Sequence, residues 1–126
     1  MLNVNEVKEK ILTLRSGNAL LAIIPEVGGC ITRYCLKTEE QVLEIMRPST
    51  QVGLAAEDPT EMSCFPLIPF SNRIRNGRFS FQGKQIKMLT NFPPEVHTIH
   101  GHGWKAPWTV SEVKENRAVL AYQHFP

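Results

Sequence analysis

Five cations lie in a stretch of the chain that contains no acid. Between positions 62 and 94 there is no Asp or Glu, and the basic side chains there are Arg73, Arg75, Arg78, Lys84 and Lys87. Arg and Lys donors can bind an anion or the hydroxyl groups of a sugar. Charged side chains also gather on surfaces that only face water. The stretch therefore indicates either a solvated face or a site for an anionic or hydroxyl-rich ligand.

Three histidines follow this stretch, at positions 97, 100 and 102. In a strand, His100 and His102 would point to one face, as in the paired metal ligands of cupin-like proteins. No carboxylate follows before Glu112, and two imidazoles alone leave a zinc or iron site short of ligands unless His124 or a distant acid completes it. We therefore expect no metal, and we expect His97 and His102 to form ordinary hydrogen bonds in a loop.

Aromatic side chains flank the cationic and histidine segments. They are Phe70, Phe92, Trp104 and Trp108. Aromatic faces suit the apolar C–H faces of a sugar, while Arg and His donors suit its hydroxyl groups. Trp108 follows a strand pattern, which favours a place in the core. Trp104 lies between Gly103 and Lys105 in a loop, so it fits either the core or a ligand contact.

Other kinds of chemistry have weak support. Asp58 is the chain's single aspartate, and no pair of carboxylates lies near the basic stretch. There is no serine nucleophile motif and no glycine-rich phosphate loop before a helix. Three cysteines (Cys30, Cys35 and Cys64), with no CxxC pair, argue against a disulfide framework or a structural zinc site. They are typical of small buried apolar residues in a reducing compartment.

The bulk composition indicates a folded cytoplasmic protein. The 126 residues fit one small domain, and 42% apolar content is enough for a core. A net charge of +2 is too small to suggest nucleic-acid binding. The N-terminal segment lacks a signal-type apolar run, and no window approaches the ~20 apolar residues of a membrane span.

The elements that must position these residues are strands. Apolar runs separated by Gly, Pro and Asn predict hairpins and short strands over residues 11–25, 30–36, 41–46, 78–88 and 108–122. In residues 47–63 and 89–107 the apolar residues follow neither the helical nor the strand period, which predicts connecting segments. A helix is an alternative around 52–57. Many short strands without a long helix indicate an all-β fold, an antiparallel sandwich or barrel.

Two segments resemble a known family. "PLIPFSNRIRNGRFSFQGKQI" and "NFPPEVHTIHGHGWKAPWTV" are similar to the N-terminal half of aldose 1-epimerases, the galactose mutarotases. The joint N-R-I, G-R-F and H-G-x-G-W pattern carries the resemblance, and "LLAIIPEVGGCITRYCL" fits it too. It implies a β-supersandwich roughly twice as long as this chain, so that residues 1–126 are one domain or the N-terminal part of a larger one.

The resemblance also implies a reaction. It is the interconversion of the α and β anomers of a free aldose by acid–base ring opening, without a cofactor. Arg73 and His100 would contact the sugar hydroxyls and the ring oxygen, Asn72 would orient their loop, and Trp104 would complete the substrate-binding set. The acid histidine and the base glutamate are expected beyond residue 126, so the chain alone would be inactive or nearly so. A non-catalytic carbohydrate-binding module and a cupin-like metalloprotein remain alternatives.

The expected partner is a small sugar. An aldose fits best, and the five cations leave a sugar phosphate open. We expect no nucleic acid and no membrane. Half a sandwich would expose sheet edges and an apolar face, so we also expect pairing with a second copy or with a missing C-terminal portion.

Overall fold

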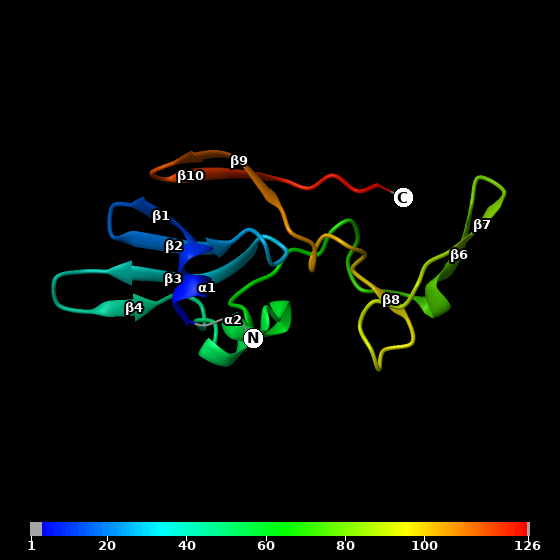
Figure 1. The fold of residues 1–126 in the computed structure, drawn as a ribbon, viewed down its shortest axis with the longest axis horizontal. Helices are drawn as coiled ribbons and strands as arrows, with labels where there is room; N and C mark the ends of the chain where they lie inside the picture. The colour runs from blue at the N-terminus through cyan, green and yellow to red at the C-terminus, as the bar shows by residue number, and fades with distance from the viewer. Residues whose placement is uncertain (1–3, 126) are drawn as a thin grey trace.

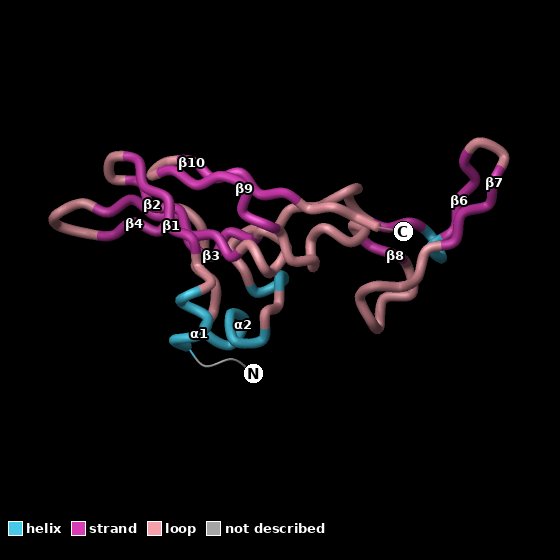
Figure 2. Tube along the Cα trace, turned by 45° about the horizontal axis from the view of Figure 1, so that its top comes forward, coloured by secondary structure: helices cyan, strands magenta, loops and turns pink. Residues whose placement is uncertain are grey.

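The computed structural model describes residues 4–125, which form an elongated molecule (Figure 1). A four-stranded sheet lies at one end and a two-stranded hairpin projects at the other, and both views agree on this arrangement (Figures 1 and 2). The elements are α1 (Val4–Glu9), β1 (Leu12–Ser16), β2 (Ala19–Ile24), β3 (Cys30–Lys37), β4 (Val42–Glu44), α2 (Gln51–Ala56), η1 (Pro59–Glu61), β5 (Arg73–Ile74), η2 (Arg75–Gly77), β6 (Arg78–Phe81), β7 (Lys84–Lys87), β8 (Thr98–Ile99), β9 (Thr109–Lys114) and β10 (Arg117–Ala121).

The four-stranded sheet is antiparallel, in the order β1-β2-β3-β4. Ser16 pairs with Ala19, so Gly17 and Asn18 make the two-residue turn that the sequence predicted. The strand expected over 41–46 is present in its central part, as β4. Together with two further antiparallel hairpins, this confirms the all-β prediction.

The hydrophobic core lies between this sheet and the two short helices. Its fully buried members are Val7, Ile24, Val27, Cys30 and Met62. Burial, and secondarily the charge of Cys64, raises the pKa of Cys30 to about 12, so this thiol behaves as an apolar group. Cys35 is buried as well, as predicted. The prediction was wrong for Cys64, which is exposed where its backbone bridges to Ile31 at the start of β3.

Of the two helices, one was an alternative in the sequence analysis and the other was not predicted. Helix α2 confirms the helical alternative near 52–57, because the Thr50 hydroxyl accepts the Gly53 N–H at 2.9 Å and begins it. Helix α1 was not predicted. Lys10 directly follows this helix and ties it to the rest of the fold, since its ammonium lies 2.7 Å from Glu26 and 3.0 Å from Glu57. No helix in residues 4–125 has the length and apolar character that crossing a bilayer requires.

Two hairpins in the second half confirm the sequence prediction. Strands β6 and β7 pair around Gln82 and Gly83, and β9 and β10 pair around Glu115 and Asn116. The β6–β7 hairpin stands apart from the four-stranded sheet (Figure 1), and Phe81 on it is 59% exposed. The region expected to be all loop, 89–107, contains the short strand β8, which pairs with β5.

A close backbone approach joins the four-stranded sheet to the loop that carries the histidines. The Gly28 N–H donates to the Ala106 carbonyl at 2.8 Å, and the Trp108 N–H donates to the Pro25 carbonyl at 3.0 Å. A Cβ atom on Gly28 would lie 2.0 Å from the Trp104 carbonyl oxygen. Glycine is therefore needed here for its missing side chain as well as for its φ of +62°.

This approach predicts a difference between two glycines. Gly17→Ala places alanine at φ +55° in open space and should cost roughly 1–2 kcal/mol, the strain of a left-handed residue. Gly28→Ala adds the collision with Trp104, so we expect a further loss of roughly 1–3 kcal/mol. Urea unfolding measures the loss in the free energy of unfolding for each variant. Equal losses in the two variants would show that the backbone around Gly28 and Trp104 shifts to accept the added methyl group at no cost.

Candidate functional site

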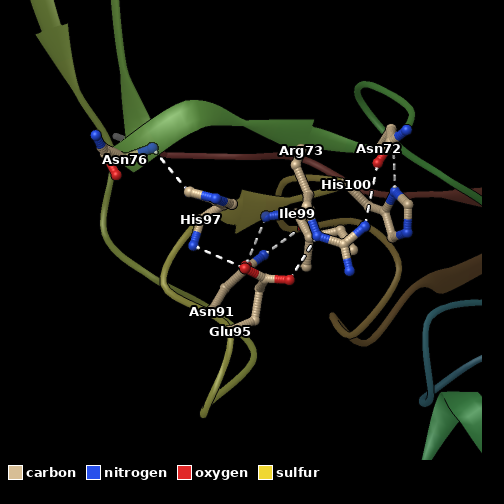
Figure 3. Close-up of polar contacts among 8 residues, drawn as sticks. All are labelled: Asn72, Arg73, Asn76, Asn91, Glu95, His97, Ile99 and His100. Atoms are coloured by element: carbon tan, nitrogen blue, oxygen red, sulfur yellow. Dashed lines mark hydrogen bonds and ion pairs between the residues drawn. The ribbon is translucent and has the colours of Figure 1, made fainter.

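The short β5–β8 ladder brings together residues that lie far apart in the sequence. Arg73 pairs with Ile99 and Ile74 pairs with Thr98, so His100 directly follows the paired segment. Figure 3 shows Arg73, Glu95 and His100 side by side, with the guanidinium between the carboxylate and the imidazole ring. Three of the residues predicted to bind substrate, Asn72, Arg73 and His100, therefore share one small region of the fold.

Asn72 and His100 hold each other through two hydrogen bonds. The Asn72 N–H donates to Nδ1 of His100 at 2.9 Å, and the His100 N–H donates to the Asn72 carbonyl at 3.0 Å. Both residues have positive φ, 70° and 58°, a conformation that Asn and His adopt more readily than most side chains. Because Nδ1 accepts a hydrogen bond, the proton of the neutral ring is on Nε2. His100 is therefore set up as a donor through Nε2.

The surroundings of His100 favour its neutral form. Burial lowers the pKa of His100 below its ordinary value, and the charge of Arg73 lowers it further. The ring packs edge-on against Trp104, with centroids 5.6 Å apart, and lies 6.3 Å from the ring of Phe65. The imidazole is thus fixed by both packing and hydrogen bonding.

Arg73 is paired with an acid that the sequence analysis did not single out. Its Nε donates to Oε2 of Glu95 at 2.5 Å, and its Nη1 donates to Oδ1 of Asn72 at 3.3 Å. The other Glu95 oxygen accepts the backbone N–H of His97 at 3.2 Å. The hydrogen bond from Arg73, followed by that from His97, holds the pKa of Glu95 below its ordinary value. The sequence signal for Glu95 was its place as the first acid after the acid-free stretch.

Asn91 is a second residue that the sequence analysis missed. Its amide nitrogen donates to the carbonyls of Ile99 (2.6 Å) and Gly101 (2.7 Å), and its Oδ1 accepts the Ile99 N–H at 2.9 Å. One side chain thus ties down the backbone on both sides of His100, and Figure 3 shows its contacts with Ile99. His97 acts in a similar way, since its Nδ1 accepts the Asn76 N–H at 3.0 Å, which confirms that it is a hydrogen-bonded loop residue.

Trp104 lies beneath the site. It is 2% exposed, its indole N–H donates to the Gly101 carbonyl at 3.1 Å, and its ring contacts those of Phe65, Phe92 and His100. Trp104 was expected in the substrate-binding set, and in this structure its ring is buried and packs edge-on against that of His100.

The other four cations do not converge on Arg73. Arg75 belongs to η2, and Arg78, Lys84 and Lys87 belong to the projecting β6–β7 hairpin (Figure 1). All four are exposed. The solvated-face interpretation therefore fits most of the cationic stretch, and the site interpretation fits Arg73.

His100 and His102 do not lie in a strand, so the one-face geometry considered for a metal-binding pair is wrong. Strand β8 ends at Ile99, before either histidine, and His100 has left-handed backbone. The ring of His102 instead stacks on that of His124, with centroids 4.8 Å apart and planes inclined by 22°. Across residues 4–125, no three His, Cys, Asp or Glu side chains are grouped so that they could hold a metal ion.

Comparison with known proteins identifies a family and a relative of similar sequence. The family model of aldose 1-epimerase matches residues 10–125. "Uncharacterized protein YphB" of Escherichia coli K12 is 32% identical over 114 residues, which are 90% of this chain and 36% of that protein.

Two solved structures resemble the fold. A "Putative aldose 1-epimerase" from Escherichia coli K12 superimposes with a TM-score of 0.81 at 30% identity, covering 92% of this chain and 37% of that one. The GalM/aldose epimerase homologue from C. elegans gives a TM-score of 0.62 at 16% identity, covering 87% and 34%. The chain thus spans a little over a third of the length of these relatives. The match across nearly all of its residues, together with its all-β fold, shows that the chain belongs to the aldose 1-epimerase family.

Proposed function

We propose that this chain supplies the sugar-binding residues of an aldose 1-epimerase, which interconverts the α and β anomers of a free aldose. The observation that carries the proposal is the pair of fixed donors, the Arg73 guanidinium and Nε2–H of His100, held next to each other through Asn72. A guanidinium is always charged and offers five donors in a fixed plane. Such donors suit the hydroxyl groups and the ring oxygen of a pyranose.

The reaction needs two proton transfers. An acid protonates the ring oxygen while a base removes the proton from the C1 hydroxyl, the ring opens to the aldehyde, and rotation about the C1–C2 bond precedes closure. Arg73 and His100 would hold the sugar and stabilise charge as it shifts. Donors that are already in place need little rearrangement when that charge develops.

The base is expected outside these residues. Glu95 is the carboxylate beside Arg73, but both of its oxygens accept hydrogen bonds and its pKa is lowered, which makes it a poor proton acceptor. We propose that the acid histidine and the base glutamate belong to the part of the family's length that these 126 residues do not span.

If this chain holds the sugar-binding residues and not the acid and base, it should bind a sugar without catalysing mutarotation. Polarimetry of galactose or glucose with the 126-residue chain should give mutarotation at the rate of buffer alone. The same sugars at millimolar concentration should shift the amide NMR signals of Asn72, Arg73 and His100. Accelerated mutarotation would mean that the acid and base lie within this chain. Sugar binding without turnover, even in a full-length relative, would favour a non-catalytic carbohydrate-binding module.

Two substitutions test the donors. Arg73→Lys keeps the charge but loses the planar fork, and His100→Asn keeps a residue that tolerates φ of 58°. Each should weaken sugar binding about tenfold, the effect of losing about one hydrogen bond to a charged or fixed donor. Arg33→Lys is the matched control, because Arg33 pairs with Glu44 in the four-stranded sheet, and it should leave affinity unchanged. Equal affinities in all the variants would place the sugar elsewhere.

The state of His100 predicts a pH dependence. Protonation of Nδ1 removes the acceptor for the Asn72 N–H, and the lowered pKa means that the folded chain favours the neutral ring. The contribution of the neutral His100 ring to the stability of the folded chain is therefore complete above the ordinary histidine pKa of about 6.5. It is lost as the pH falls through the lower pKa of His100 in the folded chain. The Asn72 amide signal and the affinity for galactose should change together in that range. In His100→Asn the change should vanish, and an Asn72 signal unaffected by acid would contradict the assignment.

A further inference from the structure

Glu95 occupies an unusual position for an acid in this part of the chain. It follows 33 residues without a carboxylate and lies against Arg73 of that same stretch. Its backbone is held by a turn, since the Glu95 N–H donates to the Phe92 carbonyl at 2.8 Å. Its side chain is 19% exposed, against 48% for Arg73. The acid therefore forms the inner member of the pair and the guanidinium the outer one.

The pair fixes the direction of the guanidinium. Nε of Arg73 is committed to Glu95 and Nη1 to Asn72, so the plane is held at two points. The direction of the remaining N–H groups of this half-exposed fork is thereby set, and Figure 3 draws no contact to its second terminal nitrogen. A guanidinium that is already oriented loses less side-chain freedom on binding than a mobile one. Glu95 acts on a ligand through Arg73, without touching that ligand itself.

The pair also sets the charge around Arg73. Arg73 and Glu95 together carry no net charge, and His100 is neutral because its Nδ1 accepts a hydrogen bond. A further cation, Lys105, is directed to the Asn91 carbonyl, to which its ammonium donates at 3.0 Å. An anion drawn to Arg73 would meet the carboxylate within a few ångströms, where repulsion offsets most of the attraction. The hydroxyl groups of an uncharged sugar meet no such opposition.

We propose that Glu95 is a positioning and specificity-determining residue, which orients Arg73 for an uncharged aldose and makes the site reject anionic sugars such as sugar phosphates. This inference rests on the proposed function in so far as Arg73 contacts the sugar. It argues against the alternative of a sugar phosphate, which the titrations below test.

The test replaces the acid by its uncharged isostere, Glu95→Gln. NMR titrations of the 126-residue chain use three probes: galactose, glucose 6-phosphate and inorganic phosphate. In the native chain we expect galactose to shift the site signals and both phosphates to leave them unaffected. In Glu95→Gln the affinity for the phosphates relative to galactose should rise at least tenfold. The signal of the Arg73 Nε–H should also move, and the pKa of His100 should fall further because the charge of Arg73 is no longer compensated.

Two companion variants separate charge from shape. Glu95→Asp keeps the charge but shortens the side chain, so it should still reject phosphate while the Arg73 Nε–H signal moves. Glu44→Gln breaks a comparable Arg–Glu pair with Arg33 in the four-stranded sheet and should change neither selectivity nor the site signals.

The outcomes distinguish this inference from the proposed function. Unchanged phosphate binding and an unmoved Arg73 Nε–H signal in Glu95→Gln would overturn the role of Glu95, even if galactose binds as proposed. Tight phosphate binding by the native chain would overturn it as well. If galactose leaves every site signal unaffected, the proposed sugar site fails, while the inorganic phosphate titration still decides whether Glu95 excludes anions from Arg73. If Glu95→Gln does not fold, the Arg73 Nε–H signal in Glu95→Asp still tests whether Glu95 orients Arg73, and tight phosphate binding by the native chain would still overturn the rejection of anions.

Discussion

The hydrogen bond from the Asn72 backbone to Nδ1 of His100 is the contact on which the rest of the site depends. It joins two segments 28 residues apart and at the same time decides which ring nitrogen carries the proton. Without it, the imidazole could turn and either nitrogen could face a ligand. With it, a neutral histidine becomes a donor of fixed direction, next to a guanidinium whose own direction is fixed by Glu95. The site obtains two oriented donors, of which the charged one is paired with a carboxylate.

This arrangement is supported by backbone contacts more than by a deep core. The β5–β8 ladder is only two residues long on each strand, and Asn91 adds three hydrogen bonds to the same stretch of backbone. Behind it, the buried Trp104 ring packs against His100, and the Trp104 carbonyl lies close to Gly28 in the turn between β2 and β3. The core between sheet and helices is thus connected to the site through the turn at Gly28 and through Phe65, which packs against the core and lies against both Trp104 and His100. The turn itself is held to the loop of Trp104 by backbone hydrogen bonds.

The sequence predicted those parts of the structure that local chemistry decides. The turns at Gly17-Asn18, Gln82-Gly83 and Glu115-Asn116 follow from residues that favour tight turns, so their hairpins were found. The pairing of β5 with β8 depends on residues distant in sequence, and its strands are too short to show a period. The roles of Asn91 and Glu95 and the burial of Trp104 depend on that pairing. Motif resemblance found Arg73 and His100 and indicated Asn72 as the residue that orients their loop, but it gave no sign of Glu95 or Asn91.

The exposure of Arg73 bears on the side from which the proposed acid and base would approach the sugar. Its guanidinium is half exposed, while the inner side of the cluster is filled by Glu95, Asn91 and the aromatic rings around Trp104. A sugar held by these donors would therefore lie on the outer side and present its opposite face away from this chain. Groups that exchange protons with the ring oxygen and the C1 hydroxyl have to approach from that open side. The relatives extend for nearly two thirds of their length beyond the part matched here, which is ample chain to cover it. Binding and proton transfer would then meet at the sugar from two sides, each held by a different part of the family's fold.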